Sequence, residues 1–426
     1  MEPKEEKKAL SAYSLLDNRV QSDPYEFYSL LHQQCPIYQM PETGIYVVTK
    51  YEDVRAVLLD TEAFSSVVLG MSALQGPNAE LYQQILRERG WEHVHVLHRS
   101  DPPEHTHYRK LVDRVFTIRR VRELLPHIEE VANELIETFI DRGTCEFIGE
   151  FAVPMPGIIM AEQLGLERGQ VDRFKTWAEA MLATSNRVMS EQEIRATAEI
   201  ELEAQHYLAD LFEKRRLSPS GDLISGLVHA HSQDEKPLTM RELQNVMHQL
   251  ITGGFETTPS ALAHGVWLLI RHPVQMETLR RDRGLIRNFV EEVLRIESPV
   301  QGLMRTVKKD TEIGDTKIPA GSVLIVRYGA ANRDADKFSC PAKFDIGRHN
   351  PAPHMSFGWG AHLCVGASLA RQEIATAFKL ILDRLEDIEL ARPLPDPPHL
   401  SSLNFLTLKE LPIRFSECRA SPPGSS

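Results

Sequence analysis

The stretch Phe357-Gly-Trp-Gly-Ala-His-Leu-Cys-Val-Gly366 decides the fold, because it is a glycine-rich loop that carries a cysteine near its end. The following residues, Ala367 to Leu385, have a strongly helical pattern, so Cys364 lies at the start of a helix. Backbone N–H groups and the positive end of the helix dipole stabilise a thiolate there, and a thiolate is a soft metal ligand. The glycines let the backbone turn sharply and approach a flat ligand closely. They are Gly358, Gly360 and Gly366.

A long helix is predicted upstream of this loop. Thr239-x-x-Glu242 forms a capping box, and the helical pattern that it opens continues to Arg271, just before His272-Pro273. About 32 residues at 1.5 Å each span roughly 48 Å, which would cross the whole domain.

This helix carries a weak stretch near its middle. Gly253, Gly254 and Pro259 each destabilise a helix interior, so we expect a bulge or kink there. Glu256 and Thr257 lie in the same stretch, which fits a groove that delivers protons to a ligand. The alternative is a packing notch in which the threonine hydroxyls bond back to carbonyls of their own helix.

The rest of the chain is mainly helical, with two strand-rich regions. Gly44 to Thr49 reads as a strand followed by a helix over 51–59, and the residues from Leu303 to Tyr328 read as a hairpin-like region. Asp101-Pro-Pro-Glu104 opens a helix that should run to about Phe116, with Asp101 as its cap. We predict a mainly α fold with small β-sheets, an α+β chain.

Composition sets limits on the class of protein. The 426 residues are 42% apolar and 25% charged, as in ordinary globular proteins. Acids outnumber bases by 60 to 48, which argues against nucleic acid as a partner. The five cysteines are scattered without a C-x-x-C pair, and neither a signal peptide nor a membrane anchor is recognisable, so a reducing cytoplasm fits best. We expect a single domain over 1–426 with flexible ends at 1–14 and 417–426.

The loop resembles the F-x-x-G-x-H-x-C-x-G haem-binding signature of the cytochrome P450 family, soluble bacterial type. Its matching residues are Phe357, Gly360, His362, Cys364 and Gly366. Three further segments resemble family motifs in the right order: Gly253-Gly-Phe-Glu-Thr-Thr258 the oxygen-activation motif, Glu292-Val-Leu-Arg295 the E-x-x-R motif, and Pro341 to Arg348 the segment that supplies a second arginine.

The resemblance implies haem b with Cys364 as the axial thiolate that binds the iron. Gly253 and Gly254 would border the haem. Burying the two propionates requires donors or cations, and the resemblance places four residues around them. These are His105, Arg109, Arg305 and His362.

Glu292, Arg295 and Arg348 would form a structural core that holds the cysteine loop. The family's reaction implies roles for Glu256 as a proton relay and for Thr257 as a hydrogen-bond donor to the bound oxygen. The product would be a hydrophobic small molecule into which one oxygen atom from O2 has been inserted.

The electrons must come from separate proteins, because no nucleotide-binding fingerprint and no room for a flavin domain are found. The resemblance implies a ferredoxin and an NAD(P)H-dependent ferredoxin reductase as partners. For the substrate, the resemblance implies a pocket whose lining includes four polar residues and one apolar residue. These are Gln249, Thr252, Gln301, Leu303 and Asn404.

Two other functions remain open at this point. One is a peroxide-driven oxygenase on the same fold, against which the intact Glu256 and Thr257 argue. The other is a non-catalytic haem sensor or carrier, against which the lack of any recognisable DNA-binding or signalling domain argues.

Overall fold

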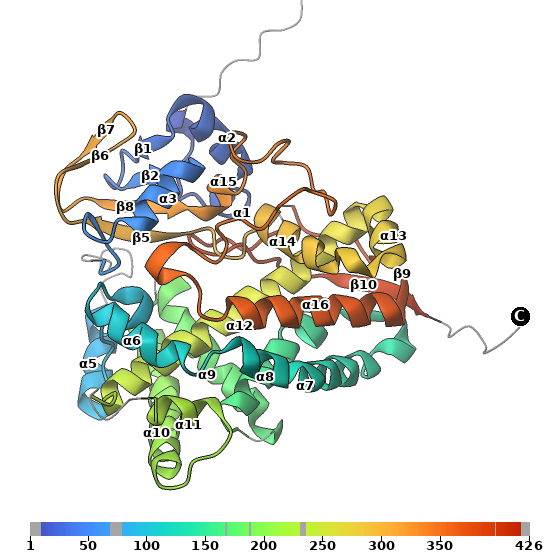
Figure 1. The fold of residues 1–426 in the computed structure, drawn as a ribbon, viewed down its shortest axis with the longest axis horizontal. Helices are drawn as coiled ribbons and strands as arrows, with labels where there is room; N and C mark the ends of the chain where they lie inside the picture. Colours follow the sequence, from blue (N-terminus) through green and yellow to red (C-terminus); the bar gives the residue numbers. More distant parts are fainter. Residues whose placement is uncertain are drawn as a thin grey trace, which may run out of the picture.

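The computed structural model describes residues 10–68, 79–166, 168–186, 189–230, 236–396 and 398–418. Helices dominate these residues, and Figure 1 shows them filling the lower and right-hand parts of the molecule. The helices are α1 (Asn18–Ser22), α2 (Tyr25–Gln34), α3 (Tyr51–Leu59), α5 (Ala79–Arg89), α6 (Glu104–Asp113), α7 (Ile118–Glu137), α8 (Pro154–Gln163), α9 (Val171–Asn186), α10 (Glu191–Leu217), α11 (Leu223–Val228), α12 (Met240–Arg271), α13 (Pro273–Arg281), α14 (Ile286–Ile296), α15 (Tyr328–Ala331) and α16 (Ala367–Arg384).

The strands form small sheets, and the largest lies beside α2, α3 and α15 at the upper left of Figure 1. Its order is β1-β2-β8-β5-β3, with β2 and β8 parallel and the other neighbours antiparallel. A second sheet has the order β4-β10-β9, and β6 pairs with β7 as a hairpin. The strands are β1 (Ile37–Gln39), β2 (Tyr46–Val48), β3 (Phe64–Ser65), β4 (Thr144–Glu146), β5 (Gly302–Val307), β6 (Thr311–Ile313), β7 (Thr316–Ile318), β8 (Val323–Arg327), β9 (Leu385–Leu390) and β10 (Pro412–Glu417).

The long helix α12 has the predicted bounds. Thr239 accepts a hydrogen bond from the backbone N–H of Glu242, and Glu242 in turn binds the backbone N–H of Thr239, so the capping box is present. The helix continues without interruption past Pro259 to Arg271, so the bulge expected at the weak stretch is absent, because the packing of both halves keeps the helix regular.

The two halves of α12 belong to different hydrophobic clusters. Apolar side chains between Leu243 and Ile251 pack with α9, α10 and α11, whereas those between Ala261 and Leu269 pack with α7, α14 and α16. The residues from Thr252 to Thr257 lie between these clusters and are mostly half-buried. The middle of α12 is therefore the part of the helix that can face a ligand.

Several elements agree with the sequence, and one detail does not. The strand after Gly44 and the helix over 51–59 are β2 and α3, the late hairpin region is β5 to β8, and α16 begins at Ala367. Asp101, however, does not cap α6. Its carboxylate accepts hydrogen bonds from the backbone N–H of Ser66 and the hydroxyl of Ser65, because β3 lies beside it, and α6 starts after Pro103 without a side-chain cap.

Among the described residues, no helix is both long enough and apolar enough to cross a membrane. Most of the ends predicted to be flexible, 1–9 and 419–426, lie outside the described residues.

Candidate haem site

The cysteine loop lies on the near side of the molecule in Figure 1, where it leads into α16. Gly358 and Gly360 have φ values of +71° and +69°, in the left-handed region that favours glycine. A Cβ at Gly360 would also lie 2.8 Å from the backbone oxygen of Leu58 on α3. The backbone N–H of Cys364 donates to the Phe357 carbonyl at 2.9 Å, which closes the loop. Both glycines are therefore required by the backbone.

The electrostatic environment of Cys364 suits a thiolate ligand. Part of the Cys364 side chain is exposed to solvent. The protein around the sulfur nevertheless displaces enough water to raise the pKa of the thiol. Hydrogen bonds from the backbone N–H groups of Gly366 and Ala367, together with the charges of Arg109 and Arg371, act in the opposite direction. The sulfur therefore lies at the N-terminus of α16, beside groups that stabilise negative charge.

The four residues assigned to the propionates converge from three separate segments. The rings of His105 and His362 lie with their centroids 4.0 Å apart. The pKa of His362 is lowered to about 3, mainly by burial and to a smaller extent by the charges of His105, Arg305 and Arg109. Arg109 donates to the carbonyl of Leu363, the residue after His362, and His105 and Arg305 are buried, so the four groups lie on one side of the loop.

This group of donors is suited to an anion. His362 Nε2 contacts the Ser66 hydroxyl at 3.0 Å, while its Nδ1 is buried and has no hydrogen-bond partner among the described residues. Arg109 binds Asp113 at 2.7 Å and also donates to the Leu363 carbonyl. A cluster of two arginines and two histidines with an unmatched buried nitrogen fits the anionic edge of haem.

The E-x-x-R motif forms a buried ion-pair network. Glu292 accepts from Arg295 at 2.7 and 2.9 Å, and from Arg348 Nε at 3.0 and 3.1 Å. The backbone N–H of Asp345 adds a fifth hydrogen bond to Glu292 at 3.0 Å. Arg295 and Arg348 use their remaining N–H groups on backbone carbonyls of the segment before Arg348, including Pro341 and Ser339.

This network is joined to the cysteine loop through Asn332. Arg295 donates to the Asn332 carbonyl at 2.8 Å, and the Asn332 side-chain oxygen accepts from the Met355 backbone N–H at 2.6 Å. The Asn332 amide donates to the Ser356 hydroxyl at 2.9 Å, and Ser356 donates to the Leu294 carbonyl. The start of the loop is thereby fixed to α14.

Arg371 also holds the loop in place. It lies over the Phe357 ring, 4.4 Å from the centroid, and pairs with Glu291 at 2.6 Å.

On α12, Gly253 is exposed, and a Cβ there would meet no atom within 4 Å. Gly254 differs, because a Cβ there would lie 3.0 Å from the Met160 side chain. Thr257 donates its hydroxyl to the Gly253 carbonyl at 2.8 Å, which is the back-bonded arrangement anticipated as the alternative to a proton groove. Glu256 is half-buried next to it.

The polar pocket candidates bond mainly to the protein itself. Gln249 accepts from the His98 backbone N–H and donates to the Val96 carbonyl, so it fastens α12 to the segment before α6. Thr252 donates to the His248 carbonyl at 2.8 Å.

Gln301 is buried and bonds to Tyr28 and to the Ser298 carbonyl. Its backbone N–H donates to the Asn404 carbonyl at 2.7 Å, so these two candidates are neighbours. Leu303 packs against the sheet.

Sequence reasoning missed two residues of the site. His98 has an accessible ring, and burial followed by the charge of Arg99 lowers its pKa to about 3, with His362 among the further causes. Ser66 binds His362 from the end of β3. His98 directly follows the apolar pair Val96-Leu97, which gave only a weak signal for it, and no sequence signal pointed to Ser66.

Taken together, the helical fold, the long helix and the cysteine loop define a haem-thiolate protein. The family model described as Cytochrome P450 matches residues 13–414, and the chain belongs to the cytochrome P450 family. Its cofactor is accordingly haem b bound through a cysteine thiolate, and its reaction is monooxygenation of a small molecule with O2 and electrons from redox partners.

Relatives cover nearly the whole chain. The 6-deoxyerythronolide B hydroxylase of Saccharopolyspora erythraea is 31% identical over 402 residues, which cover 92% of this chain and 96% of that protein. The structure of CYP109Q5 from Chondromyces apiculatus has a TM-score of 0.83 at 32% identity, covering 95% of this chain and 98% of that chain. The structure of CYP109E1 from Bacillus megaterium in complex with testosterone has a TM-score of 0.79 at 28% identity, covering 92% and 99%.

Proposed function

We propose that this monooxygenase oxidises a medium-sized or large hydrophobic molecule, with Cys364 as the iron ligand and with Glu256 and Thr257 in proton delivery. The observation that carries the proposal is the convergence of His105, Arg109, Arg305 and His362 beside the loop of Cys364. When bound, the haem activates O2 and inserts one oxygen atom into the substrate.

Haem retention depends on two groups of residues. Cys364 holds the iron, with its negative charge stabilised by the N–H groups of Gly366 and Ala367. The two arginines and two histidines hold the propionates, and the Nδ1 atom of His362 supplies a polar atom that needs a partner. Glu292, Arg295 and Arg348 position the loop and take no part in the chemistry.

Proton delivery is assigned to the middle of α12. The Thr257 hydroxyl proton points to the Gly253 carbonyl, and a rotation about its C–O bond redirects that proton to a ligand beside Gly253. The open space beside Gly253 supports such an approach. The carboxyl of Glu256, the preceding residue, replaces the proton that Thr257 passes on.

The substrate is proposed to be predominantly apolar, because Gln249, Thr252 and Gln301 already use polar atoms on the protein. Leu303 supplies an apolar contact, and the accessible ring of His98, kept neutral by its low pKa, supplies a polar one. The names of the relatives, a macrolactone hydroxylase and a testosterone complex, support macrolactones and steroids as the first classes to test.

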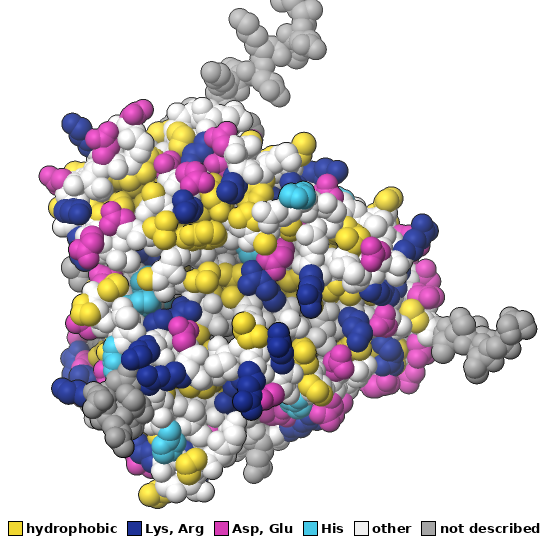
Figure 2. All heavy atoms as spheres, in the orientation of Figure 1, with side chains coloured by type: hydrophobic (Ala, Val, Ile, Leu, Met, Phe, Trp, Pro, Cys, Tyr) yellow, Lys and Arg dark blue, Asp and Glu magenta, His cyan; other side chains and the backbone are white. Residues whose placement is uncertain are grey.

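The electron donors are proposed to be a ferredoxin and its NAD(P)H-dependent reductase, in the cytoplasm. Figure 2 shows Lys and Arg side chains gathered over the middle of the face where Figure 1 draws α16 and the cysteine loop. Lys110 on α6, Arg114 at the end of α6 and Lys379 on α16 are exposed. An acidic ferredoxin would be attracted to this face despite the negative charge of the whole chain.

A reconstitution tests the proposal. The haem-loaded protein is combined with ferredoxin, reductase and NADPH, and steroids and macrolactones are screened first for a spin-state shift and then for oxidised product under ¹⁸O2. The proposal predicts product with one labelled oxygen that requires both redox proteins. Product formed at full rate with hydrogen peroxide alone, and none with the redox proteins, would contradict it.

A further inference from the structure

Two buried histidines face each other on the side of α12 that packs against the C-terminal segment. His264 lies on α12 and His399 lies in the segment that follows β9, and both are almost fully buried. Their Nε2 atoms are 3.1 Å apart. Two nitrogens at this distance can be neighbours only if a proton or another cation lies between them.

The protonation of His399 is fixed by its other nitrogen. Its Nδ1 lies 3.0 Å from the backbone carbonyl of Ser22, at the end of α1. A carbonyl oxygen can only accept, so Nδ1 carries the hydrogen and, in the neutral ring, Nε2 is a lone pair.

The protonation of His264 follows from Ser260 in the same way. Its Nδ1 lies 3.2 Å from the Ser260 hydroxyl oxygen, and that hydroxyl donates its only proton to the Leu406 carbonyl. The Ser260 oxygen therefore accepts from Nδ1.

Because the hydrogen of each ring is on Nδ1, each ring in its neutral form directs the Nε2 lone pair at the other across 3.1 Å, which is repulsive unless a cation accepts both. We propose that His264 and His399 bind a divalent zinc ion through their Nε2 atoms. Zinc–nitrogen bonds of about 2.0–2.1 Å place two ligands of a tetrahedral ion roughly 3.3 Å apart, close to the observed separation. Histidine ligands commonly donate the other ring N–H to a carbonyl or similar acceptor, as both of these rings do.

Glu297 is the third group at this site. A carboxylate oxygen of Glu297 lies within 4.8 Å of the histidine nitrogens. The Tyr25 hydroxyl donates to Glu297, and a guanidinium nitrogen of Arg333 lies 3.4 Å from its carboxylate. It supplies the negative charge that a buried zinc requires, by direct ligation after a small shift or through a zinc-bound water.

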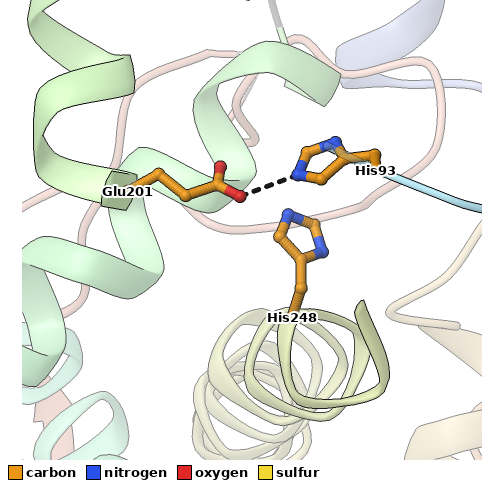
Figure 3. Close-up of side chains that lie close together, drawn as sticks. All are labelled: His93, Glu201 and His248. Carbon is orange, nitrogen blue, oxygen red and sulfur yellow. Dashed lines mark hydrogen bonds and ion pairs between the residues drawn. The ribbon is translucent and has the colours of Figure 1, made fainter. Parts of the chain in front are cut away.

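A second cluster of the same residue types does not carry this inference. His93, Glu201 and His248 come together from the segment after α5, from α10 and from α12, and Figure 3 shows the His248 ring directed at the contact between the other two. There, His93 Nε2 lies 2.7 Å from Glu201, while the Gln83 amide donates to His93 Nδ1. Gln83 is held in that orientation because its oxygen accepts from the His93 backbone N–H.

His93 therefore carries its hydrogen on Nε2 and donates it to Glu201, so this nitrogen is not available to a metal. The Tyr82 hydroxyl and the Gln205 amide also bind the Glu201 carboxylate. In this cluster the hydrogen bonds of His93 and Glu201 are made without an ion, although His248 Nε2 is buried with no hydrogen-bond partner among the described residues. The cluster has the same residue types but no second free histidine lone pair, so it provides a matched control.

A zinc ion at His264 and His399 would join three distant parts of the chain. It would fasten α12 to the segment of His399, which pairs with Leu408, and to the end of α1 through Ser22. The same segment continues to Asn404 and Phe405, which contact Gln301 and Val300 beside the proposed pocket. The ion would therefore stabilise one wall of the pocket and take no part in the reaction.

The test measures zinc in the haem-loaded protein. Wild type is incubated with zinc chloride, passed over a chelating resin and analysed by inductively coupled plasma mass spectrometry, with haem content measured in parallel. We expect about one zinc per chain in wild type and in the control His248→Asn, and less than about 0.2 in His399→Phe and His264→Leu. X-ray absorption at the zinc edge of wild type should show imidazole nitrogens at about 2.0–2.1 Å.

Wild type with full haem content and no retained zinc would overturn the proposal and leave a proton shared between the two rings. Zinc lost in His248→Asn but kept in His399→Phe would also overturn it. If the histidine variants do not fold, the wild-type stoichiometry and the zinc-edge spectrum still decide, because a zinc bound only by oxygen atoms contradicts the proposal.

Discussion

Replacement of Glu292 by glutamine should release the haem rather than change the product. The Glu292 carboxylate is fully buried and accepts five hydrogen bonds, from Arg295, Arg348 and the backbone of Asp345. Glutamine keeps one oxygen acceptor but removes the charge, which leaves two guanidinium groups buried and uncompensated. Breaking a buried ion pair in this way costs about 3–5 kcal/mol, a large part of the 5–15 kcal/mol that keeps a domain folded.

The assay compares haem per chain, from the ratio of Soret to protein absorbance, with the free energy of unfolding in urea. The matched control is Glu277→Gln, because Glu277 pairs with Arg281 at 2.7 Å on the exposed surface of α13. An exposed pair contributes at most about 1 kcal/mol, so the control should keep its haem. If Glu292→Gln loses less than about 1 kcal/mol and binds haem fully, the structural role assigned to Glu292 is wrong.

Three further predictions follow from single residues. Thr257→Ala should keep haem and substrate binding but divert electrons to hydrogen peroxide, and unchanged product per NADPH would remove Thr257 from proton delivery. Gly360→Ala should lose about 1–3 kcal/mol of unfolding free energy, because φ is +69° and the new Cβ would lie 2.8 Å from the Leu58 carbonyl oxygen. The variant should release its haem at a lower urea concentration than wild type, and equal urea midpoints would contradict this. The pKa of His248 is lowered to about 3, mainly by burial and then by the charge of His93. As the pH falls from 6.5 toward 3, His248 is therefore protonated in the unfolded chain but not in the folded chain, so stability is lost. Wild type should therefore lose about 2 kcal/mol more than His248→Asn between pH 6.5 and 5, and parallel urea-unfolding curves across that range would refute the buried neutral state of His248.

Local signals in the sequence predicted the main elements well. The capping box at Thr239 and the proline after His272 set both ends of α12, because caps and prolines act on the residues beside them. The glycines at 358 and 360 predicted a sharply turned loop, which their positive φ values show. Glu292 and Arg295 are one helical turn apart, so their contact is also local.

Contacts between distant segments could not be predicted in this way. Asp101 has the residue type of a helix cap, but β3 brings Ser65 and Ser66 to its carboxylate instead. His264 and His399 are 135 residues apart, and no pattern in either segment indicates that their rings face each other.

The polar pocket candidates show the same limit, since Gln249 bonds to the Val96 backbone and Gln301 to the Tyr28 hydroxyl, both in distant segments. The division into one domain over 1–426 stays a prediction.

The absorption spectrum of the dithionite-reduced protein with carbon monoxide tests the central assignment most directly, on wild type and on Cys364→Ser. Cys364 is placed as the thiolate that holds the haem iron, at the N-terminus of α16 beside Arg109 and Arg371. The account predicts a strongly red-shifted Soret band in wild type that is absent from Cys364→Ser. A wild-type protein that binds haem but shows the band of histidine or neutral thiol ligation, or a variant that keeps the red-shifted band, would contradict it.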